Sequence, residues 1–156
     1  MTRIELPDEA ATTRLGAALA GGVAPGRVLF LRGELGAGKT TLVRGLLRAL
    51  GYAGRVKSPT YGLLELYTLS SLNLYHFDFY RVKDRSEWVS SGFRDYFNPE
   101  SVCVVEWPER AGGSLAPADL EVSLEFAGEG RRATLTPCSE AGRAWLDAAL
   151  ERWQPA

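Results

Sequence analysis

One segment constrains this chain more than any other part of its sequence. Residues 28–31 form a short apolar run, the loop Gly33-x-x-x-x-Gly38-Lys39-Thr40 follows it, and an apolar pattern with helical spacing comes next. That pattern forms one helical stripe, whose members are Leu42, Val43, Leu46, Leu47 and Leu50. A strand, a glycine-rich loop and a helix in this order are typical of a loop that binds nucleotide phosphates.

The spacing of the loop has a physical reason. Glycines let the backbone turn its N–H groups inward, and these groups attract phosphate together with the N-terminus of the following helix. Lys39 can then reach the β- and γ-phosphates, and the Thr40 hydroxyl is placed to ligate Mg²⁺. The alternative is an ordinary glycine-rich turn with a solvated lysine. The predicted nucleotide-binding residues of this segment are Gly33, Leu35, Gly36, Ala37, Gly38, Lys39, Thr40 and Thr41.

Composition favours a single domain that spans residues 1–156. A chain of 156 residues with 46% hydrophobic content can bury its own core but is short for two domains. No stretch approaches the roughly 18 apolar residues of a membrane helix, and the N-terminal segment is charged where a signal peptide is apolar. We therefore expect a cytoplasmic protein with no membrane partner. Cys103 and Cys138 are isolated, which predicts ordinary buried or semi-buried thiols.

The charge of the chain limits its partners. A net charge of −1 argues against an extended nucleic-acid surface. Two basic clusters nevertheless occur, within residues 44–57 and 81–85. They are either solvated faces of helices and loops or a docking surface for an acidic partner or RNA.

Hydrophobic periodicity predicts the other elements. A first helix contains Leu15, Ala18 and Leu19, is capped by Asp8 or a nearby threonine and ends at Gly21-Gly22. The remaining expected elements are an antiparallel hairpin of strands 61–69 and 72–80, one or two short helices within 84–97 that break near Gly92, strands 101–106, 119–127 and 131–136, and a helix 139–152 with Trp145, Leu146 and Leu150 buried. This order predicts an α/β P-loop NTPase fold: a mixed sheet with a parallel core, an antiparallel hairpin extension and flanking helices.

Two carboxylates stand where a phosphate-binding loop needs one. Such loops work with an acid at the end of a neighbouring strand, which holds Mg²⁺ or positions water. Asp78 follows LNLYHF, Glu106 follows SVCVV, and either fits, although SVCVV better matches a buried parallel strand because both its faces are apolar. A helix cap or an ion pair is the structural alternative for each acid. Both acids are predicted catalytic residues beside Lys39 and, with Thr40, predicted metal ligands.

Further residues are candidates for a switch or for contact with a partner. His76 shares a strand face with Asp78, although a lone histidine in an aromatic strand is more often structural. Trp107 directly follows Glu106 and either packs in the core or closes the site. The segment Ser58-Pro59-Thr60-Tyr61 lies where switch proteins place a loop that senses the γ-phosphate, and a proline turn is equally compatible with it. No N-K-x-D segment occurs, so the sequence favours ATP over GTP.

Five segments together resemble one protein family. They read GELGAGKTT (33–41), VKSPTY (56–61), YHFDFYR (75–81), DYF (95–97) and VVEWPE (104–109). In this order and spacing, over about residues 6–137, they resemble the TsaE family, also called YjeE. That family is the bacterial ATPase component of the machinery that makes N6-threonylcarbamoyladenosine in tRNAs.

The resemblance implies a role within a larger complex. It implies an ATPase that uses ATP and Mg²⁺, docks on the TsaB–TsaD pair and hydrolyses ATP to sustain turnover, while TsaD carries the threonylcarbamoyl transfer. Contact with tRNA is expected through these partners, because the chain is close to neutral.

The resemblance also assigns residues by position. Lys39 and Thr40 match the phosphate and Mg²⁺ ligands, Asp78 matches the acid of the H-x-D-x-Y-R strand, and Glu106 matches the acid of the E-W motif that binds Mg²⁺ or orients water. Further nucleotide contacts, implied by the family's N-terminal P-D-E segment and by an arginine in its last hairpin, are Asp8 and either Arg131 or Arg132.

Two positions depart from the family pattern, and two other functions remain compatible with the sequence. Glu34 replaces the Asp that usually follows the first glycine, and Gly62 stands where S-P-T-[YF] normally continues with Thr, so no ligand is assigned at position 62. A P-loop small-molecule kinase would need its own acceptor pocket and an arginine-rich lid, for which the chain offers no obvious segment. A nucleotide-controlled binding module would act through occupancy, with little hydrolysis.

Overall fold

The computed structural model describes residues 1–57, 59, 64–70, 72–80, 82 and 92–153. Within these residues, seven strands form one sheet in the order β1-β7-β6-β2-β5-β4-β3. The strands are β1 Thr2–Leu6, β2 Val28–Arg32, β3 Leu64–Thr68, β4 Asn73–Asp78, β5 Ser101–Glu106, β6 Leu120–Ala127 and β7 Gly130–Pro137. The helices are α1 Glu9–Leu19, α2 Lys39–Ala49 and α4 Glu140–Arg152, with 3₁₀ turns η1 Ala20–Gly22, η2 Phe93–Tyr96 and η3 Pro108–Ser114.

The four central strands of the sheet run parallel. Strand β2 pairs in parallel with β5 and β6, and β4 pairs in parallel with β5. The outer pairs, β6 with β7, β7 with β1 and β4 with β3, are antiparallel. The predicted mixed sheet is therefore confirmed. Because β2, β4 and β5 are parallel, their carboxyl ends meet at one edge, which is where open α/β sheets bind ligands.

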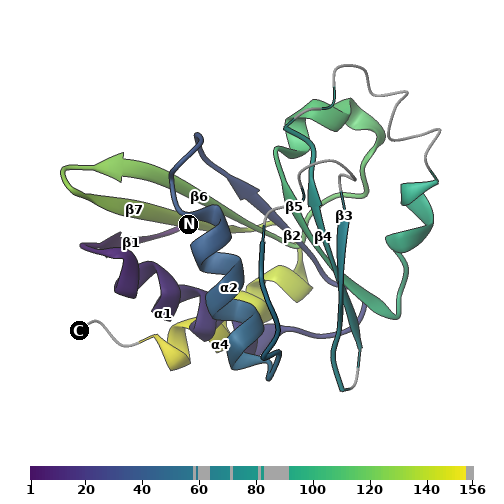
Figure 1. Cartoon of the computed structure of the whole chain (residues 1–156), viewed down its shortest axis with the longest axis horizontal. Coiled ribbons are helices and arrows are strands. Elements are labelled where there is room, and N and C mark those ends of the chain that lie inside the picture. The colour runs from purple at the N-terminus through teal and green to yellow at the C-terminus, as the bar shows by residue number, and fades with distance from the viewer. Residues whose placement is uncertain (58, 60–63, 71, 81, 83–91, 154–156) are drawn as a thin grey trace.

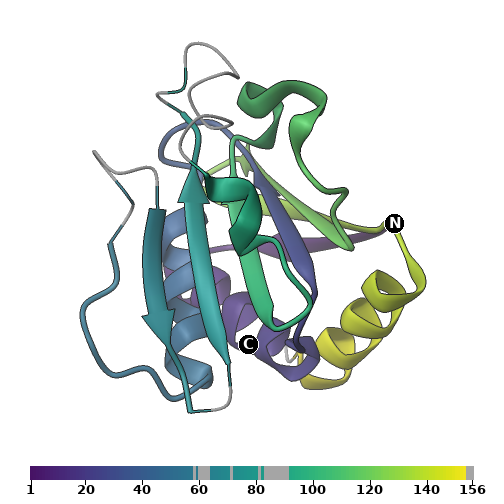
Figure 2. The ribbon, with the colours of Figure 1, turned by 90° about the vertical axis from the view of Figure 1, so that its right-hand side faces the viewer.

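Helices α1, α2 and α4 cover one face of this sheet (Figures 1 and 2). Aliphatic side chains from both layers, among them Leu31, Leu46 and Val104, are fully buried between them. The second face of β2, β4 and β5 is covered by the region of η2 and by the segment after β5, which bury Phe77 and Val105. Period-2 alternation along β4 thus separates the two cores, as the sequence predicts.

Helices α1 and α2 pack with their backbones in close approach. A Cβ atom at Gly16 of α1 would overlap the carbonyl oxygen of Leu42, and a Cβ atom at Gly45 of α2 would overlap that of Thr13. Two glycines on facing helices therefore allow a separation that larger residues would prevent. This contact holds the N-terminal turn of α1 beside that of α2, so that Thr12 lies close to Gly38 of the glycine-rich loop.

Several helix and strand ends differ from the sequence prediction. Asp8 caps α1 by accepting a hydrogen bond from Ala11 N (2.9 Å), as predicted, and the α-helix passes at Leu19 into the 3₁₀ turn η1, which ends at the predicted glycines. Leu150 of α4 is 38% exposed, so its predicted burial is wrong, and Ala149 lies in the core in its place. Strand β1 has no counterpart in the sequence prediction, because a five-residue edge strand leaves only a weak pattern. Residues 2–6 form a strand because they pair with β7.

Other expected elements are confirmed as far as the structure describes them. The antiparallel hairpin is β3 and β4, while residues 61–63 lie outside the described residues. Residues 83–91 lie outside them too, and a 3₁₀ turn follows Gly92. Cys103 is buried and Cys138 is exposed, so the expected burial holds for the first thiol only. No helix in the described part of the chain is long and apolar enough to cross a membrane.

Candidate functional site

The glycine-rich loop connects β2 to α2 at the carboxyl edge of the parallel strands. Two of its glycines are required by the backbone. Gly33 has φ 151°, and a Cβ atom there would lie 2.7 Å from the carbonyl oxygen of Leu124 in β6. Gly38 has φ 106° and stands directly before the first residue of α2. Side chains are strained in this left-handed region, so the loop conformation depends on glycine at both positions.

Two hollows meet at this loop and share Gly36, Ala37, Gly38 and Thr41. The first, which we call the phosphate cavity, has a volume of about 350 Å³. Lys39, Thr40, Asp78, Glu106 and Trp107 also line it. The second, which we call the side cavity, has a volume of about 320 Å³ and lies toward α1 and the β6–β7 turn. The structure therefore brings Lys39, Thr40 and both predicted acids together.

Lys39 is held by its own loop in this structure. Its Nζ donates to the carbonyl oxygens of Gly33 and Glu34, the latter at 3.2 Å, and lies 4.6 Å from the ring centre of Trp107. Burial lowers the pKa of Lys39, while the nearby carboxylates of Glu106, Asp78 and Glu109 oppose that shift. The ammonium group thus occupies a partly dry position with acids around it.

The two acids end neighbouring strands and face each other in register. Asp78 closes β4, Glu106 closes β5, and these two residues are paired between the strands. Asp78 Oδ1 accepts a hydrogen bond from Tyr80 N (2.9 Å), and burial raises the pKa of its carboxyl group, an effect that Glu106 reinforces. Glu106 is 2% exposed. Two carboxylates in this position concentrate negative charge that a cation would relieve.

His76 lies inside the protein rather than on its surface. Its side chain is 0% exposed, and its Nε2 lies 2.5 Å from Oε2 of Glu106. The other ring nitrogen, Nδ1, has no hydrogen-bond partner among the described residues. A buried residue cannot touch another protein in this conformation, so the predicted partner contact at His76 has no support here.

Trp107 adopts a backbone conformation that is rare for its type. Its φ of 56° makes it the one non-glycine residue with positive φ in the described part of the chain. Its ring lies 5.0 Å from that of Tyr80, and the Arg110 guanidinium lies 5.8 Å from it. Non-glycine residues in the left-handed region persist where surrounding contacts hold them, often at functional sites. The conformation aims the Trp107 ring over Lys39.

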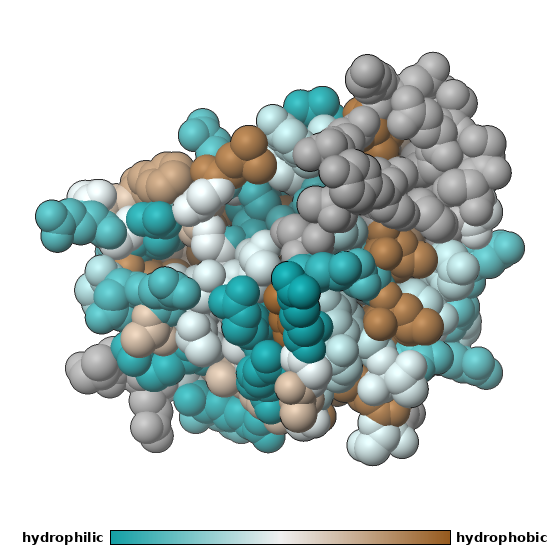
Figure 3. All heavy atoms as spheres, in the orientation of Figure 1, coloured by the Kyte–Doolittle hydropathy of each residue, from teal (hydrophilic) through white to brown (hydrophobic). Residues whose placement is uncertain are grey.

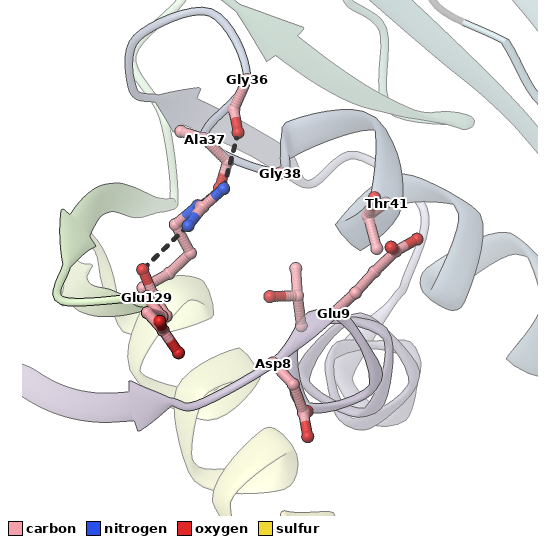
Figure 4. Close-up of a pocket in the computed structure, with 10 residues that line it drawn as sticks. Asp8, Glu9, Gly36, Ala37, Gly38, Thr41 and Glu129 are labelled. Carbon is pink, nitrogen blue, oxygen red and sulfur yellow. Dashed lines mark hydrogen bonds between the residues drawn. The ribbon is translucent and has the colours of Figure 1, made fainter.

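The side cavity separates the two candidate arginines. Arg131 lines it and donates to the carbonyl oxygens of Ala37 (3.2 Å) and Gly36 (3.1 Å), and Figure 4 marks the second of these bonds. Arg132 points to the opposite face of β7, where it pairs with Glu5 at 2.7 Å. Since strand side chains alternate, only one of two consecutive arginines can face the loop.

Sequence reasoning missed several residues of the side cavity. Asp8 lines it but points away from the loop in Figure 4, in keeping with its helix cap, whereas Glu9 reaches toward Thr41. Thr12 and Glu129 also line the cavity. The family resemblance points to the N-terminal segment and to the last hairpin, but only the α1–α2 crossing and the β1–β7 pairing show that Glu9, Thr12 and Glu129 lie beside the loop.

The predicted switch segment is described only at Pro59, which is buried. Ser58, Thr60 and Tyr61 lie outside the described residues. On the strand side of this segment, Tyr67 Oη donates to the carbonyl oxygen of Lys57 (3.4 Å). The switch role of this segment stays a prediction.

The donor set at the phosphate cavity suits Mg²⁺ bound together with a nucleotide. The cavity offers oxygens from the Thr40 hydroxyl and from the carboxylates of Asp78 and Glu106. The described residues contain no group of three His, Cys, Asp or Glu side chains that could hold a metal alone. Mg²⁺ in nucleotide sites is bound by one or two carboxylates together with substrate phosphates. These residues therefore fit that ion.

Comparison with known proteins places the chain in a family. The sequence profile of the threonylcarbamoyl adenosine biosynthesis protein TsaE matches residues 6–134. The TsaE of Haemophilus influenzae is 44% identical over 116 residues, which are 74% of this chain and 73% of that one. The TsaE of a Nostoc species is 37% identical over 143 residues, which are 88% and 86% of the two chains.

A solved structure agrees with the sequence comparison. The crystal structure of Bacillus subtilis YdiB superposes with a TM-score of 0.82 at 28% identity and covers 96% of this chain and 94% of its own. This chain therefore belongs to the TsaE family of threonylcarbamoyl adenosine biosynthesis proteins.

Proposed function

We propose that this protein is the Mg²⁺-dependent ATPase subunit that binds the TsaB–TsaD complex and supports formation of N6-threonylcarbamoyladenosine in tRNAs that read ANN codons. Family membership supports the tRNA-modification role, and the proteins it resembles are named for this biosynthesis. One observation carries the ATPase role: Lys39, Thr40, Asp78 and Glu106 line a single cavity with the glycine-rich loop. The site of action would be the cytoplasm, with tRNA reached through the partners.

In this proposal the two cavities hold different parts of the ATP molecule. The phosphates enter the phosphate cavity, where Lys39 exchanges the carbonyl oxygens of Gly33 and Glu34 for phosphate oxygens. The adenosine lies in the side cavity, whose Arg131 guanidinium and Glu9 carboxylate offer polar contacts to its ring and ribose. The exchange at Lys39 replaces neutral carbonyl oxygens with anionic phosphate oxygens, so the ammonium group gains the attraction of an opposite charge.

Hydrolysis needs a water molecule that is held in line with the bond that breaks. Glu106 is the residue we assign to orient that water, and Asp78 and Thr40 complete the oxygen donors for the metal. Mg²⁺, when bound here, neutralises charge on the phosphate oxygens. Trp107 lies over the lysine and excludes solvent from one side of the cavity. The products are ADP and inorganic phosphate.

Two substitutions test the assignments. We expect Glu106→Gln to bind ATP and lose hydrolysis, because the amide keeps the size of the side chain but not its charge. Lys39→Ala should weaken both binding and hydrolysis. Phosphate release and nucleotide affinity are measured on the same preparations. A Glu106→Gln protein that hydrolyses ATP at the wild-type rate would contradict the role of Glu106.

Reconstitution tests the place of this activity. Purified TsaB and TsaD are supplied with tRNA, threonylcarbamoyl-adenylate and ATP, with or without this chain or its Lys39→Ala form. We expect repeated rounds of tRNA modification only with the unaltered chain. Modification that turns over equally well without it would refute the proposed function. Transfer of radiolabelled γ-phosphate to an acceptor other than water would point to a kinase instead.

A further inference from the structure

A fully buried histidine and a fully buried glutamate meet at the phosphate cavity. His76 belongs to β4 and Glu106 to β5, and their side chains are 0% and 3% exposed. Nε2 of the imidazole lies 2.5 Å from Oε2 of the carboxylate. A carboxylate only accepts hydrogen bonds, so Nε2 is the donor.

This histidine costs stability at its position. Its neighbours on the same face are the aliphatic residues Leu74 and Val104, and an aliphatic side chain would fill the layer without polar atoms. Nδ1 is buried without a partner in the described part of the chain, and an unsatisfied buried polar atom lowers the stability of the folded state. The contact that compensates for this cost is the hydrogen bond from Nε2 of His76 to the carboxylate of Glu106.

We propose that His76 is a positioning residue that fixes the carboxylate of Glu106. The inference rests on the proposed function, in which Glu106 orients the attacking water. In that step the water oxygen bonds to the γ-phosphorus, the bond to the bridging oxygen breaks with its electrons leaving on ADP, and the water proton passes to solvent through Glu106. The bond from His76 holds Oε2 and leaves Oε1 for the cavity that Glu106 lines.

Lys39 is a competing partner for this carboxylate. The two groups interact electrostatically, yet no ion pair within 4.0 Å joins them among the described residues. A glutamate side chain released from His76 can turn toward the ammonium group and pair with it. That pair would take the carboxylate away from the water, so His76 keeps the two groups apart as well as fixing one of them.

Three variants and one matched control test the inference. His76→Gln places an amide N–H near the position of Nε2, His76→Asn carries a donor that is too short, and His76→Met carries none. Leu74→Met is the control, since Leu74 is fully buried on the same strand face two residues away. We measure kcat and KM for ATP, and by calorimetry the factor by which Mg²⁺ changes the affinity for ADP, which needs no turnover.

We expect His76→Met to lose kcat by roughly tenfold to a hundredfold with little change in KM, the usual effect of removing a residue that orients a metal ligand or catalytic group. The factor by which Mg²⁺ changes ADP affinity should fall in His76→Met to the value measured for Glu106→Gln. A protein that carries both substitutions should show no further loss of this factor. His76→Gln should retain most of the activity, while His76→Asn should resemble His76→Met. Leu74→Met should match the wild type.

The outcomes separate this inference from the proposed function. A wild-type protein that hydrolyses no ATP contradicts the proposed function, and the Mg²⁺ effect on ADP binding then decides the role of His76. The inference is overturned if the His76→Met protein keeps the kcat of the wild type, or if Mg²⁺ changes its affinity for ADP by the same factor as in the wild type. If His76→Met does not fold, equal activity of the Gln and Asn variants overturns it, because only the first keeps a donor within reach.

Discussion

Charge burial is the main physical feature at the scale of single residues. Asp78 and Glu106 lie in register at the ends of two strands, and burial raises the pKa of Asp78. The folded protein therefore binds a proton at Asp78 more tightly than the unfolded chain does. Between the unfolded and folded pKa values the folded state loses stability as pH rises, because its ionised carboxylate is poorly solvated.

This feature predicts that Asp78→Asn stabilises the nucleotide-free protein. The amide keeps an oxygen that can accept the bond from Tyr80 N but carries no charge. Its melting temperature in EDTA should exceed that of the wild type at pH 8, and the difference should shrink as pH falls toward 3.8, the ordinary pKa of the group. ATP hydrolysis should be lost in the same variant. An Asp78→Asn protein less stable than the wild type at pH 8 would contradict this expectation.

Alternation along β7 predicts opposite results for two consecutive arginines. Arg131 faces the glycine-rich loop and Arg132 faces away from it. We expect Arg131→Ala to weaken ADP binding about tenfold or more, since hydrogen bonds to charged groups contribute about 1.5–3 kcal/mol. Arg132→Ala, which removes two surface ion pairs, with Glu5 and Glu125, is the matched control and should change affinity less than twofold. Equal losses would show that the side cavity does not hold the nucleotide.

At the scale of elements, the crossing of α1 and α2 builds the side cavity. The glycine contacts let the two helices approach until the first turns of both line one hollow. The loop position follows from β2 and α2 alone, but the wall opposite it follows from this crossing. Strand β1 acts similarly, because its pairing with β7 places the β6–β7 turn beside the start of α1.

The crossing predicts a specific destabilisation by Gly45→Ala. Alanine raises helix propensity by about 1 kcal/mol, but its Cβ would overlap the Thr13 carbonyl oxygen and separate the helices. Overpacking of this kind costs about 1–3 kcal/mol, so we expect a net loss of unfolding free energy in urea together with weaker ADP binding. Ala49→Ser, at an exposed position of α2, should change neither property. A Gly45→Ala protein as stable as the wild type would argue against close backbone packing.

At the scale of the whole molecule, the two cavities join β4, β5, β7, α1 and α2 around the loop that follows β2. Among the described residues, the large apolar side chains that are exposed are Met1, Leu35, Leu66, Phe126 and Leu150. Exposed large apolar side chains are scattered, and the face that carries α1 and α2 is mostly hydrophilic over α2 (Figure 3). A ligand in these cavities would therefore contact most layers of the fold at once.

This arrangement predicts strong stabilisation by nucleotide. A ligand that binds only the folded state adds about 2.7 kcal/mol at a concentration of 100 Kd, and about 1 kcal/mol raises the melting temperature of a domain of this size by roughly 2–4 °C. Mg²⁺ with ADP should thus raise the melting temperature by roughly 5–10 °C. The Lys39→Ala protein should show little of this shift. A shift of the same size in Lys39→Ala would place the nucleotide elsewhere.

The loop and its acids could be predicted from the sequence because each depends on local chemistry. Glycine spacing fixes the loop conformation, and acids after apolar runs fall at strand ends. The sequence also left open questions that only long-range packing could answer. Arg131 rather than Arg132 faces the loop because of the register between β6 and β7, and His76 is buried because β4 lies between β3 and β5.

The sequence by itself thus determined a glycine-rich loop between a strand and a helix, two acids at strand ends, the order of most elements and the family. Only the tertiary structure decided what surrounds them: the bond between His76 and Glu106, the ring of Trp107 over Lys39, and the side cavity. The physical reason is the separation along the chain of the residues that make each contact. Loop and strand conformations follow from neighbouring residues, whereas these contacts join residues that lie far apart in the chain and meet only when the sheet and helices pack.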